Sequence, residues 1–212
     1  MTTIEHALLG ADLVLATGLN RQFGWQLAAL AGACAVLPDW DGLTILWSVP
    51  LFDTAHRAWG HGLLSSAVVA VFFALLDYRF DLMQRFAGFF VRLLRVQVSD
   101  ALLQRRQPLS FSGTCVWVGA AISASYSHLL ADIVVSGTAT LADWDVKIFF
   151  PFSDKGIVYP LVPWGDVGNT IILLSGMFAM LRWNNRVQTI AIIILSLVIA
   201  YSIMRISKNT LF

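Results

Sequence analysis

The stretch Phe52–Asp77, FDTAHRAWGHGLLSSAVVAVFFALLD, joins a polar cluster to a long apolar run. The cluster holds His56, Arg57 and His61, and the run from Gly62 to Leu76 contains 15 apolar or small residues without a charge. Such a run predicts a helix at membrane depth. Because histidine is the commonest metal-binding side chain and the usual proton shuttle, two histidines at the mouth of this helix indicate chemistry at a bilayer surface.

The composition of the whole chain is that of an integral membrane protein. Of its 212 residues, 58% are hydrophobic and 13% are charged, and the mean hydropathy is +0.72, whereas a soluble domain carries about 25% charged residues. No repeat or low-complexity tract stands out, so we expect one membrane domain, 1–212. The net charge of +1 argues against a nucleic-acid partner, because binding phosphates needs an excess of Lys and Arg.

The apolar segments predict an all-α, multi-pass transmembrane helical bundle of about six helices. Thr2–Leu37 is interpreted as a short helical hairpin packed against longer helices, because its second arm is too short for the roughly 30 Å hydrocarbon core. Further helices are predicted for Gly62–Leu76, Phe111–Val135, Thr170–Leu181 and Val187–Met204.

The segment Asp77–Gln107 is different in kind, because polar residues recur in it at steps of three and four. These residues are Asp81, Arg85, Gly88, Arg92, Arg95 and Ser99, and the apolar residues fall on the opposite side. The pattern predicts an amphipathic helix in the plane of the headgroups, with 79–106 as a cytoplasmic insert. Contact with anionic lipid or a partner and a solvated connector are both compatible with it.

Positive charge in short loops predicts the orientation in the membrane. The Arg-rich segments 79–106 and 182–186 and the turn at Arg21 are expected to be cytoplasmic, and the acidic loop 136–169 is expected to be on the outer side. In this scheme all four histidines lie near outer helix ends. The C-terminal Arg205 and Lys208 would also be outside, which the rule does not favour.

Two pairs of polar residues have a spacing that suits metal binding. His128 and Asp132 are four residues apart, so on a helix they project from one face and can bind the same ion. Asp39 and Asp41 follow a proline, where an extended chain places both carboxylates on one side.

The chain thus gathers four imidazoles and three carboxylates at one end of the predicted bundle. Because a catalytic zinc needs about three protein ligands, these donors suffice for one ion or for two ions about 3.5–4 Å apart. Arg57 is suited to hold a phosphate. Asp166 is a candidate to join the site, whereas Asp12 and Asp53 are interpreted as structural. The seven donors are His6, His56, His61, His128, Asp39, Asp41 and Asp132.

The order of these motifs resembles the YdjM-like family of bacterial inner-membrane proteins. The resemblance covers about residues 5–155 and rests on His6, LPDWD at 37–41, HRAWGH at 56–61, SHLLAD at 127–132 and FFPFS at 149–153. The family is described as membrane-bound metal-dependent hydrolases and is compared with the zinc phospholipase C fold.

The resemblance implies six metal ligands: His6, Asp39, His56, His61, His128 and Asp132. Two features depart from the family pattern. The family usually has Thr before the second histidine of the HRAWGH motif and Ser after it, where this chain has Gly60 and Gly62. The basic insert 79–106 is an elaboration.

Together these observations predict a metal-dependent hydrolase that cleaves an ester or phosphoester of a lipid-type substrate from the periplasmic side of the inner membrane. A divalent metal, with zinc expected, activates water, Asp41 acts as general base or completes the coordination, and Arg57 binds the anionic group of the substrate. The alternatives are a non-enzymatic metal-binding membrane protein, a transporter and a di-iron lipid oxidase. The sequence leaves the oligomeric state open.

Overall fold

The computed structural model describes residues 1–95, 110–136, 145–159 and 161–209, with side chains up to Arg205 in the last helix. Within these ranges every regular element is a helix, and the loops add two isolated bridges, Val135–Val162 and Val146–Ile157. The prediction of an all-α fold is therefore confirmed.

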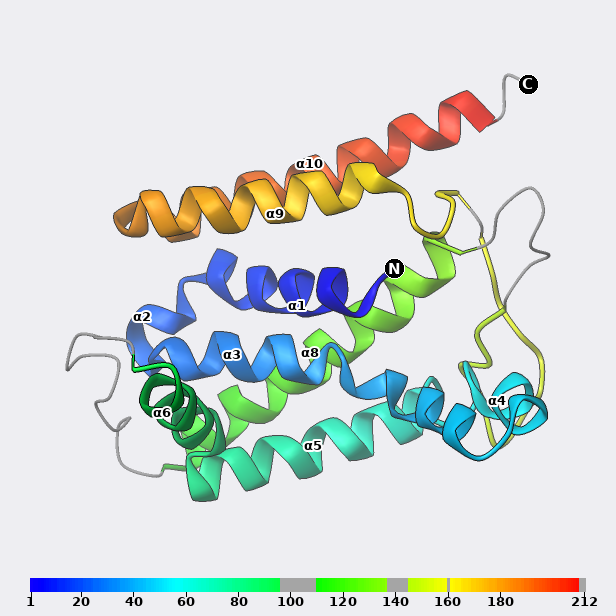
Figure 1. Cartoon of the computed structure of the whole chain (residues 1–212), viewed down its shortest axis with the longest axis horizontal. Helices are drawn as coiled ribbons and strands as arrows, with labels where there is room; N and C mark the ends of the chain where they lie inside the picture. The colour runs from blue at the N-terminus through cyan, green and yellow to red at the C-terminus, as the bar shows by residue number, and fades with distance from the viewer. Residues whose placement is uncertain (96–109, 137–144, 160, 210–212) are drawn as a thin grey trace.

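The N-terminal hairpin lies at the centre of the molecule (Figure 1). Its arms are α1 (Thr3–Thr17) and α3 (Trp25–Cys34), and the short helix α2 (Leu19–Phe23) fills the turn between them. Gly18, with φ of 74°, ends α1 in the left-handed conformation that glycine adopts at low cost. The predicted hairpin over Thr2–Leu37 is thus confirmed.

After α3 the chain bends toward the end of the bundle where the N-terminus lies. The 3-10 helix η1 (Leu37–Leu46) makes an angle of 44° with α3, and α4 (Val49–Ala55) follows it. Pro38 stands in the first turn of η1, where a missing N–H and a fixed φ are tolerated. Figure 1 shows this segment beside the start of the next long helix.

Two long helices pack against each other, and the later one in the chain also packs against both arms of the hairpin. They are α5 (Leu63–Phe80) and α8 (Phe111–Val134), which confirm the helices predicted for Gly62–Leu76 and Phe111–Val135. Small buried side chains line their interface and let the two backbones approach closely. The buried residues of this interface include Ala70, Ala74, Trp117, Ala121 and Ala124.

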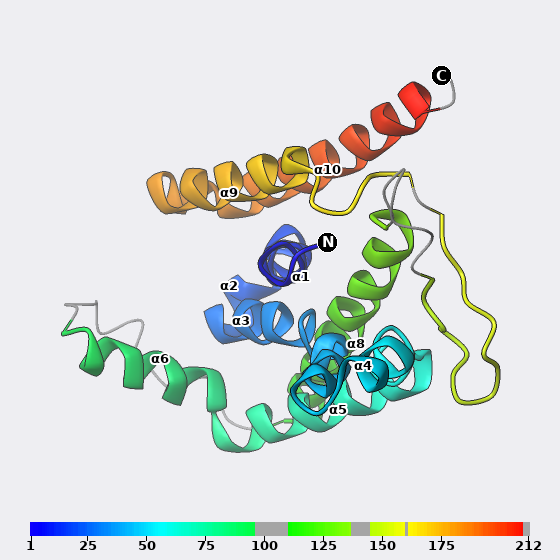
Figure 2. The same cartoon turned by 45° about the vertical axis from the view of Figure 1, so that its right-hand side comes forward.

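The C-terminal hairpin covers α1 on the side opposite α3 (Figures 1 and 2). It consists of α9 (Val167–Arg182), the short 3-10 turn η2 (Asn184–Arg186) and α10 (Val187–Asn209). Both helices were predicted, and α1 is therefore enclosed between two helical layers.

The amphipathic helix is shorter than predicted for Asp77–Gln107. Helix α6 covers Leu82–Leu93, because the chain breaks at Asp81, which has a φ of 52°. The carboxylate of Asp77 accepts a hydrogen bond from the backbone N–H of Met83 at 2.7 Å, so α6 begins as a separate helix.

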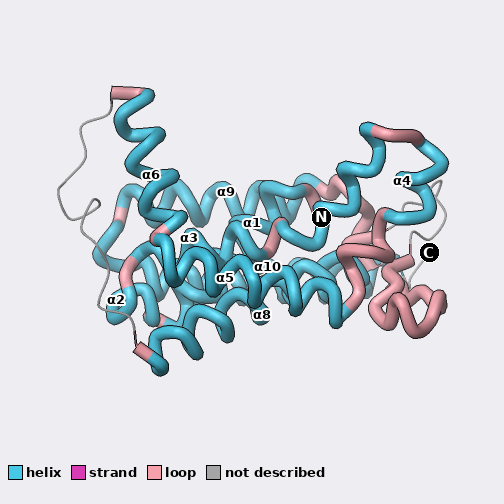
Figure 3. The backbone as a smooth tube through the Cα atoms, turned by 90° about the horizontal axis from the view of Figure 1, so that it is seen from below, coloured by secondary structure: helices cyan, strands magenta, loops and turns pink. Residues whose placement is uncertain are grey.

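Helix α6 projects away from the bundle (Figures 2 and 3) and has no buried residue. Phe86, Phe89 and Phe90 are exposed, as are Arg85 and Arg92. The amphipathic character is confirmed for this helix, and the rest of the predicted insert, from residue 96, lies outside the described residues.

Among the described residues, two helical segments are long and apolar enough to cross a membrane, namely Leu63–Phe80 and Asn184–Arg205. The bent pair of α3 and η1 makes a third if it acts as one span. The described residues therefore hold two or three candidate spans, and the other helices, including the 24-residue α8, pack around them.

Substituting Gly10 with Ala should destabilise the central hairpin. The new Cβ would lie 2.5 Å from the Cβ of Ala35 and 2.7 Å from the carbonyl oxygen of Ala31, so α1 and α3 would have to separate. Overpacking of this kind costs about 1–3 kcal/mol, more than alanine gains in helix propensity. Chemical unfolding in detergent measures the difference.

Gly119→Ala in α8 is the matched control, because its Cβ would meet no atom within 4 Å. This variant should be neutral or slightly more stable than the parent protein. Equal stability of the two variants would contradict the close approach of α1 and α3.

Candidate metal centre

The turn between α4 and α5 carries three of the predicted site residues and is fixed on two sides. The backbone oxygen of Arg57 accepts from Lys147 N at 2.9 Å, and the N–H of Leu63 donates to the oxygen of Ile148 at 2.8 Å. A side chain at Gly60 would collide with the carbonyl of Pro38. The absence of a Cβ at this position therefore lets the turn lie directly on the start of η1.

Asp41 lies completely buried behind the two histidines of this turn. Its Oδ1 is 2.8 Å from Nδ1 of His56, and its Oδ2 is 3.0 Å from Nδ1 of His61. The same Oδ2 accepts from the backbone N–H of Gly60 at 2.8 Å. Because both carboxylate oxygens are engaged in this way, Asp41 holds the two imidazoles in place.

His61 and His128 meet at the centre of the site. Their Nε2 atoms are 3.1 Å apart, and both side chains are fully buried. The Nδ1 of His128 lies 2.7 Å from the carbonyl oxygen of Ala35, which accepts hydrogen bonds only, so this nitrogen carries the proton. The Nδ1 of His61 likewise donates to the carboxylate of Asp41. In the neutral rings, both Nε2 atoms therefore direct lone pairs into the same space.

Two carboxylates approach this nitrogen pair. Oδ1 of Asp39 is 3.7 Å from Nε2 of His61 and 3.5 Å from Nε2 of His128. Oδ2 of Asp132 is 3.6 Å from each of the same nitrogens. Tetrahedral zinc with bonds of about 2.0–2.1 Å keeps its ligand atoms roughly 3.3–3.4 Å apart. Each carboxylate oxygen, together with the two Nε2 atoms, therefore forms a triangle of the size that three ligands of one zinc ion have.

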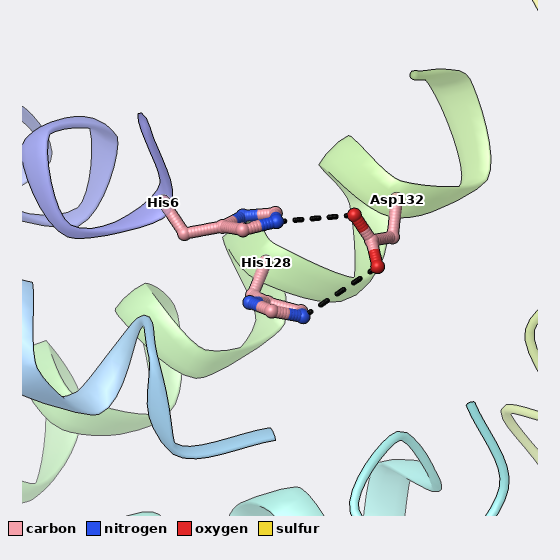
Figure 4. A group of neighbouring side chains, drawn as sticks. All are labelled: His6, His128 and Asp132. Carbon is pink, nitrogen blue, oxygen red and sulfur yellow. Dashed lines mark hydrogen bonds and ion pairs between the residues drawn. The ribbon is translucent and has the colours of Figure 1, made fainter. Parts of the chain in front are cut away.

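The other oxygen of Asp132 belongs to a second group of contacts (Figure 4). Oδ1 lies 3.0 Å from Nε2 of His6 and 2.8 Å from the α-amino group of Met1. The ring of His6 stacks on that of His128 with 3.7 Å between centroids. Nδ1 of His6 has no hydrogen-bond partner among the described residues. His6 therefore supports Asp132 and His128 from the side of α1.

Negative charge dominates the electrostatics around His61. Burial of this imidazole opposes its protonation, but the contacts with Asp132 and Asp41 outweigh burial and raise its pKa to about 9. A positive charge between the two Nε2 atoms is thus favoured. A divalent cation carries two positive charges at this position, whereas a proton carries one.

The structure brings the predicted donors together, but in different positions relative to the centre. Asp39, His61, His128 and Asp132 converge, whereas His56 contacts Asp41 and stacks on the ring of Phe52, 4.8 Å away. Among the described residues, three overlapping groups have donor atoms close enough to hold an ion: His6, His128 and Asp132; Asp39, His61 and His128; and Asp41, His56 and His61.

Arg57 and Asp166 lie differently from what the sequence indicated. The guanidinium of Arg57 is buried, 3.2 Å from Oδ2 of Asp132, and donates to Oγ of Ser136 at 2.7 Å. Asp166 caps α9 and binds Arg205 at 2.8 Å and the hydroxyl of Tyr201 at 2.6 Å. Asp166 is in none of the ion-binding groups of the described residues.

A family model described as YdjM inner membrane protein matches residues 1–209 of the chain. The chain belongs to the YdjM family of inner membrane proteins. No curated protein and no solved structure matches it. The description of the YdjM family gives a membrane location and no reaction. Membership therefore agrees with the apolar candidate spans, and the chemistry is indicated by the residues of the site.

The structure also explains two positions where this YdjM-family chain departs from the expected motif. A side chain at Gly60 would collide with Pro38, and a Cβ at Gly62 would lie 2.6 Å from the backbone oxygen of Phe150. Close backbone packing against η1 and the loop around Phe150 therefore takes the space of the hydroxyl side chains expected there.

Some contacts of the site had no signal in the sequence. The carbonyl of Ala35, at the bend between α3 and η1, fixes His128, and Pro38, three residues later, has no N–H that could compete for it. Ser136 accepts a hydrogen bond from Arg57. The only hint in the sequence is that Arg57 lies inside the HRAWGH motif and Ser136 lies shortly after the SHLLAD motif.

Replacing either central imidazole should remove the bound ion. His61→Ala and His128→Ala each delete one of the two Nε2 atoms that both carboxylates approach, so the metal-to-protein ratio after dialysis should fall to background. Element analysis of purified protein measures it, and size-exclusion chromatography shows whether the variants fold.

Two further variants separate ligands from supporting groups. Asp53→Asn alters an exposed carboxylate on α4 and should retain the full metal content. Asp41→Asn should weaken metal binding by roughly 10–100-fold without abolishing it, as loss of a group behind a metal-binding histidine does. Full metal retention in His61→Ala and His128→Ala would contradict the assignment.

Proposed function

We propose that this protein is a membrane-embedded, metal-dependent hydrolase that cleaves an ester or phosphoester of a lipid-type substrate. One observation carries the proposal: two buried imidazole nitrogens 3.1 Å apart face each other, with a carboxylate oxygen of Asp39 and one of Asp132 within 3.7 Å of both. Imidazole and carboxylate ligands of this kind suit zinc. Because the three groups of donors overlap, the proposal includes a site with one ion as well as a site with two ions.

Asp39 gives the site its open side. Its side chain is 26% exposed, whereas those of His61, His128 and Asp132 are at most 4% exposed. Bound zinc acts as a Lewis acid and lowers the pKa of a coordinated water to about 7. Asp39 is the carboxylate that water and substrate can reach. Its Oδ1 faces the two Nε2 atoms, so in the proposal its other oxygen accepts the proton of the attacking water.

Asp41 and Arg57 act as positioning residues in this scheme. The carboxylate of Asp41 fixes the tautomer of His61 through Nδ1, as a carboxylate behind a metal-binding histidine commonly does. Arg57 holds Asp132 through its guanidinium. These placements favour support of the site over the general-base and phosphate-binding roles expected from the sequence.

A lipid-type substrate fits the surface next to Asp39. The neighbouring residues of η1 and the turn after it expose large apolar side chains, with Trp47 75% exposed. Exposed aromatic residues of this kind gather at membrane–water interfaces. The others on this segment are Trp40, Leu43, Ile45 and Leu46. A substrate that diffuses in the bilayer would therefore reach Asp39 along an apolar surface.

The distribution of arginines supports a site on the periplasmic face. Arg21, Arg79, Arg182 and Arg186 lie on α2, on the end of α5 and around the α9–α10 turn, at one end of the molecule (Figure 1). The metal centre lies at the other end, near α4 and the N-terminus. By the positive-inside rule we place the arginine end in the cytoplasm of a multi-pass bundle. Arg205, at the opposite end, is neutralised by Asp166.

A non-enzymatic metal-binding protein is the second candidate, and one feature favours it. Four protein donors around one ion make a closed coordination shell, which is typical of structural zinc. The donors lie at one end of the bundle. This position argues against a transporter, whose binding site usually lies near the middle of the membrane.

An activity assay on zinc-loaded protein in lipid nanodiscs distinguishes these functions. Diacyl phospholipids and a generic phosphodiester serve as substrates, and release of fatty acid or of the alcohol product is followed with time. We expect turnover that a chelator removes and zinc restores. Asp39→Asn keeps one side-chain oxygen toward the ion, so zinc at saturating concentration should remain bound. Turnover should fall by roughly 100-fold or more, because a group that takes a proton contributes about 10²–10⁴ in rate.

Asp53→Asn is again the control and should keep the activity of the parent protein. Full zinc occupancy with no hydrolysis of any ester tested would contradict the hydrolase and favour the structural metal site.

A further inference from the structure

A crevice of about 370 Å³ lies between α1, α8 and α10, on the side of α1 that faces the C-terminal hairpin. Its walls are almost entirely apolar, and its volume falls within the range of about 300–1,000 Å³ found for small-molecule sites. The side chains that define it include Leu9, Leu13, Leu130, Val134, Leu195 and Ile199. Metal-binding residues do not line it.

One polar side chain in this crevice lacks a partner. Asn169, in the first turn of α9, is 1% exposed, and neither its amide nitrogen nor its amide oxygen forms a hydrogen bond to any described residue. The hydroxyls of Ser127 and Ser202, which also line the crevice, donate to the carbonyls of Ala124 and Val198. Leaving a buried amide unpaired is costly, so a ligand with a polar atom is expected beside Asn169.

The composition of its walls indicates that the crevice faces the hydrocarbon of the bilayer. It is lined by α10, whose span Asn184–Arg205 is the more apolar of the two candidate spans. Leu130, Ile199 and Ile203 line it and are each at least 60% exposed, so they lie at its rim. Lipid chains therefore reach this opening more easily than water-soluble molecules do.

The depth of Asn169 suits the ester region of a lipid. Asn169 lies close in sequence to Asp166, which pairs with Arg205 at the end of α10. Charged residues at the end of a span mark the headgroup level. Leu13 lies in the second half of α1, and Leu195 lies ten residues before Arg205 on α10, so both are further toward the membrane interior. A chain that starts at Asn169 would thus run inward between α1 and α10.

We propose that this crevice binds one acyl chain of a membrane glycerolipid, with the amide of Asn169 donating a hydrogen bond to the ester carbonyl of that chain. The single chain fits better than a helix of another copy of the protein, because a helix is about 10 Å wide with its side chains. The site is separate from the metal centre, and lipid binding here does not require hydrolysis.

Native mass spectrometry of delipidated protein tests the proposal with two probes, a diacyl phosphatidylethanolamine and its dialkyl ether analogue. The ether lipid has the same chains and headgroup but lacks the carbonyl. The parent protein should bind the diacyl lipid roughly two- to tenfold more tightly, which is the gain expected from one hydrogen bond.

Three variants assign the binding to the crevice. Asn169→Leu keeps the volume and removes the donor, so the two lipids should bind equally well. Leu195→Trp fills the crevice and should weaken the binding of both lipids. Ile193→Trp places the same side chain on the exposed face of α10, outside the crevice, and should change neither.

Metal content and the size-exclusion profile show whether each variant is folded. Ile193→Trp controls for the addition of a tryptophan to α10, and Asn169→Leu still tests the proposal if Leu195→Trp does not fold. A diacyl preference that survives Asn169→Leu would overturn the proposal, because the preference would then arise elsewhere. Equal binding of the two lipids to the parent protein would overturn it as well and would indicate that water, or a second copy of the chain, pairs with Asn169.

Discussion

The fixed orientation of two imidazole rings is the constraint on which the rest of the site depends. His61 and His128 come from different elements, and each donates the proton on Nδ1 to an acceptor behind it, Asp41 in one case and the carbonyl of Ala35 in the other. Their remaining nitrogens are thereby directed at each other across 3.1 Å. Two lone pairs at that distance, with carboxylates around them, are stable only with a positive charge between them.

The helical architecture serves this arrangement by concentrating polar groups at one end. The middle of the bundle is built from small apolar side chains, so helices approach closely and few charges occur at mid-depth. Bends and helix ends supply the exceptions: η1 brings Asp39 and Asp41, the turn before α5 brings His61, and the last turns of α8 bring Asp132. The cost of burying these groups is offset by contacts among them, which is the usual sign of a functional centre in a membrane protein.

Much of this could be predicted from the sequence, because uninterrupted apolar runs and clustered histidines leave a direct signal. The run Gly62–Leu76 gave α5 with its start correct to one residue, and the resemblance of the motifs agrees with the YdjM family. The convergence of His61, His128, Asp39 and Asp132 also followed from placing helix ends on one side.

The rest depends on contacts that have no local signal. The regular spacing around Asp81 favours one continuous helix, yet the carboxylate of Asp77 caps a new one at Met83. Likewise, residue type identifies His56 and Asp41 as donors but not which atoms they present. Only the packed turn shows that Asp41 faces Nδ1 of His61, away from the shared centre. The contact of Arg57 also had no local signal, since its partner Asp132 is 75 positions away in the sequence.

X-ray absorption spectroscopy of the zinc-loaded protein reports the ligands of the ion. We expect two imidazole nitrogens and carboxylate oxygens bound at about 2.0–2.1 Å, with the imidazole signal reduced to one ring in either His61→Ala or His128→Ala if any zinc remains. A spectrum with no imidazole scattering, or one that is identical in the parent protein and both variants, would contradict the shared site.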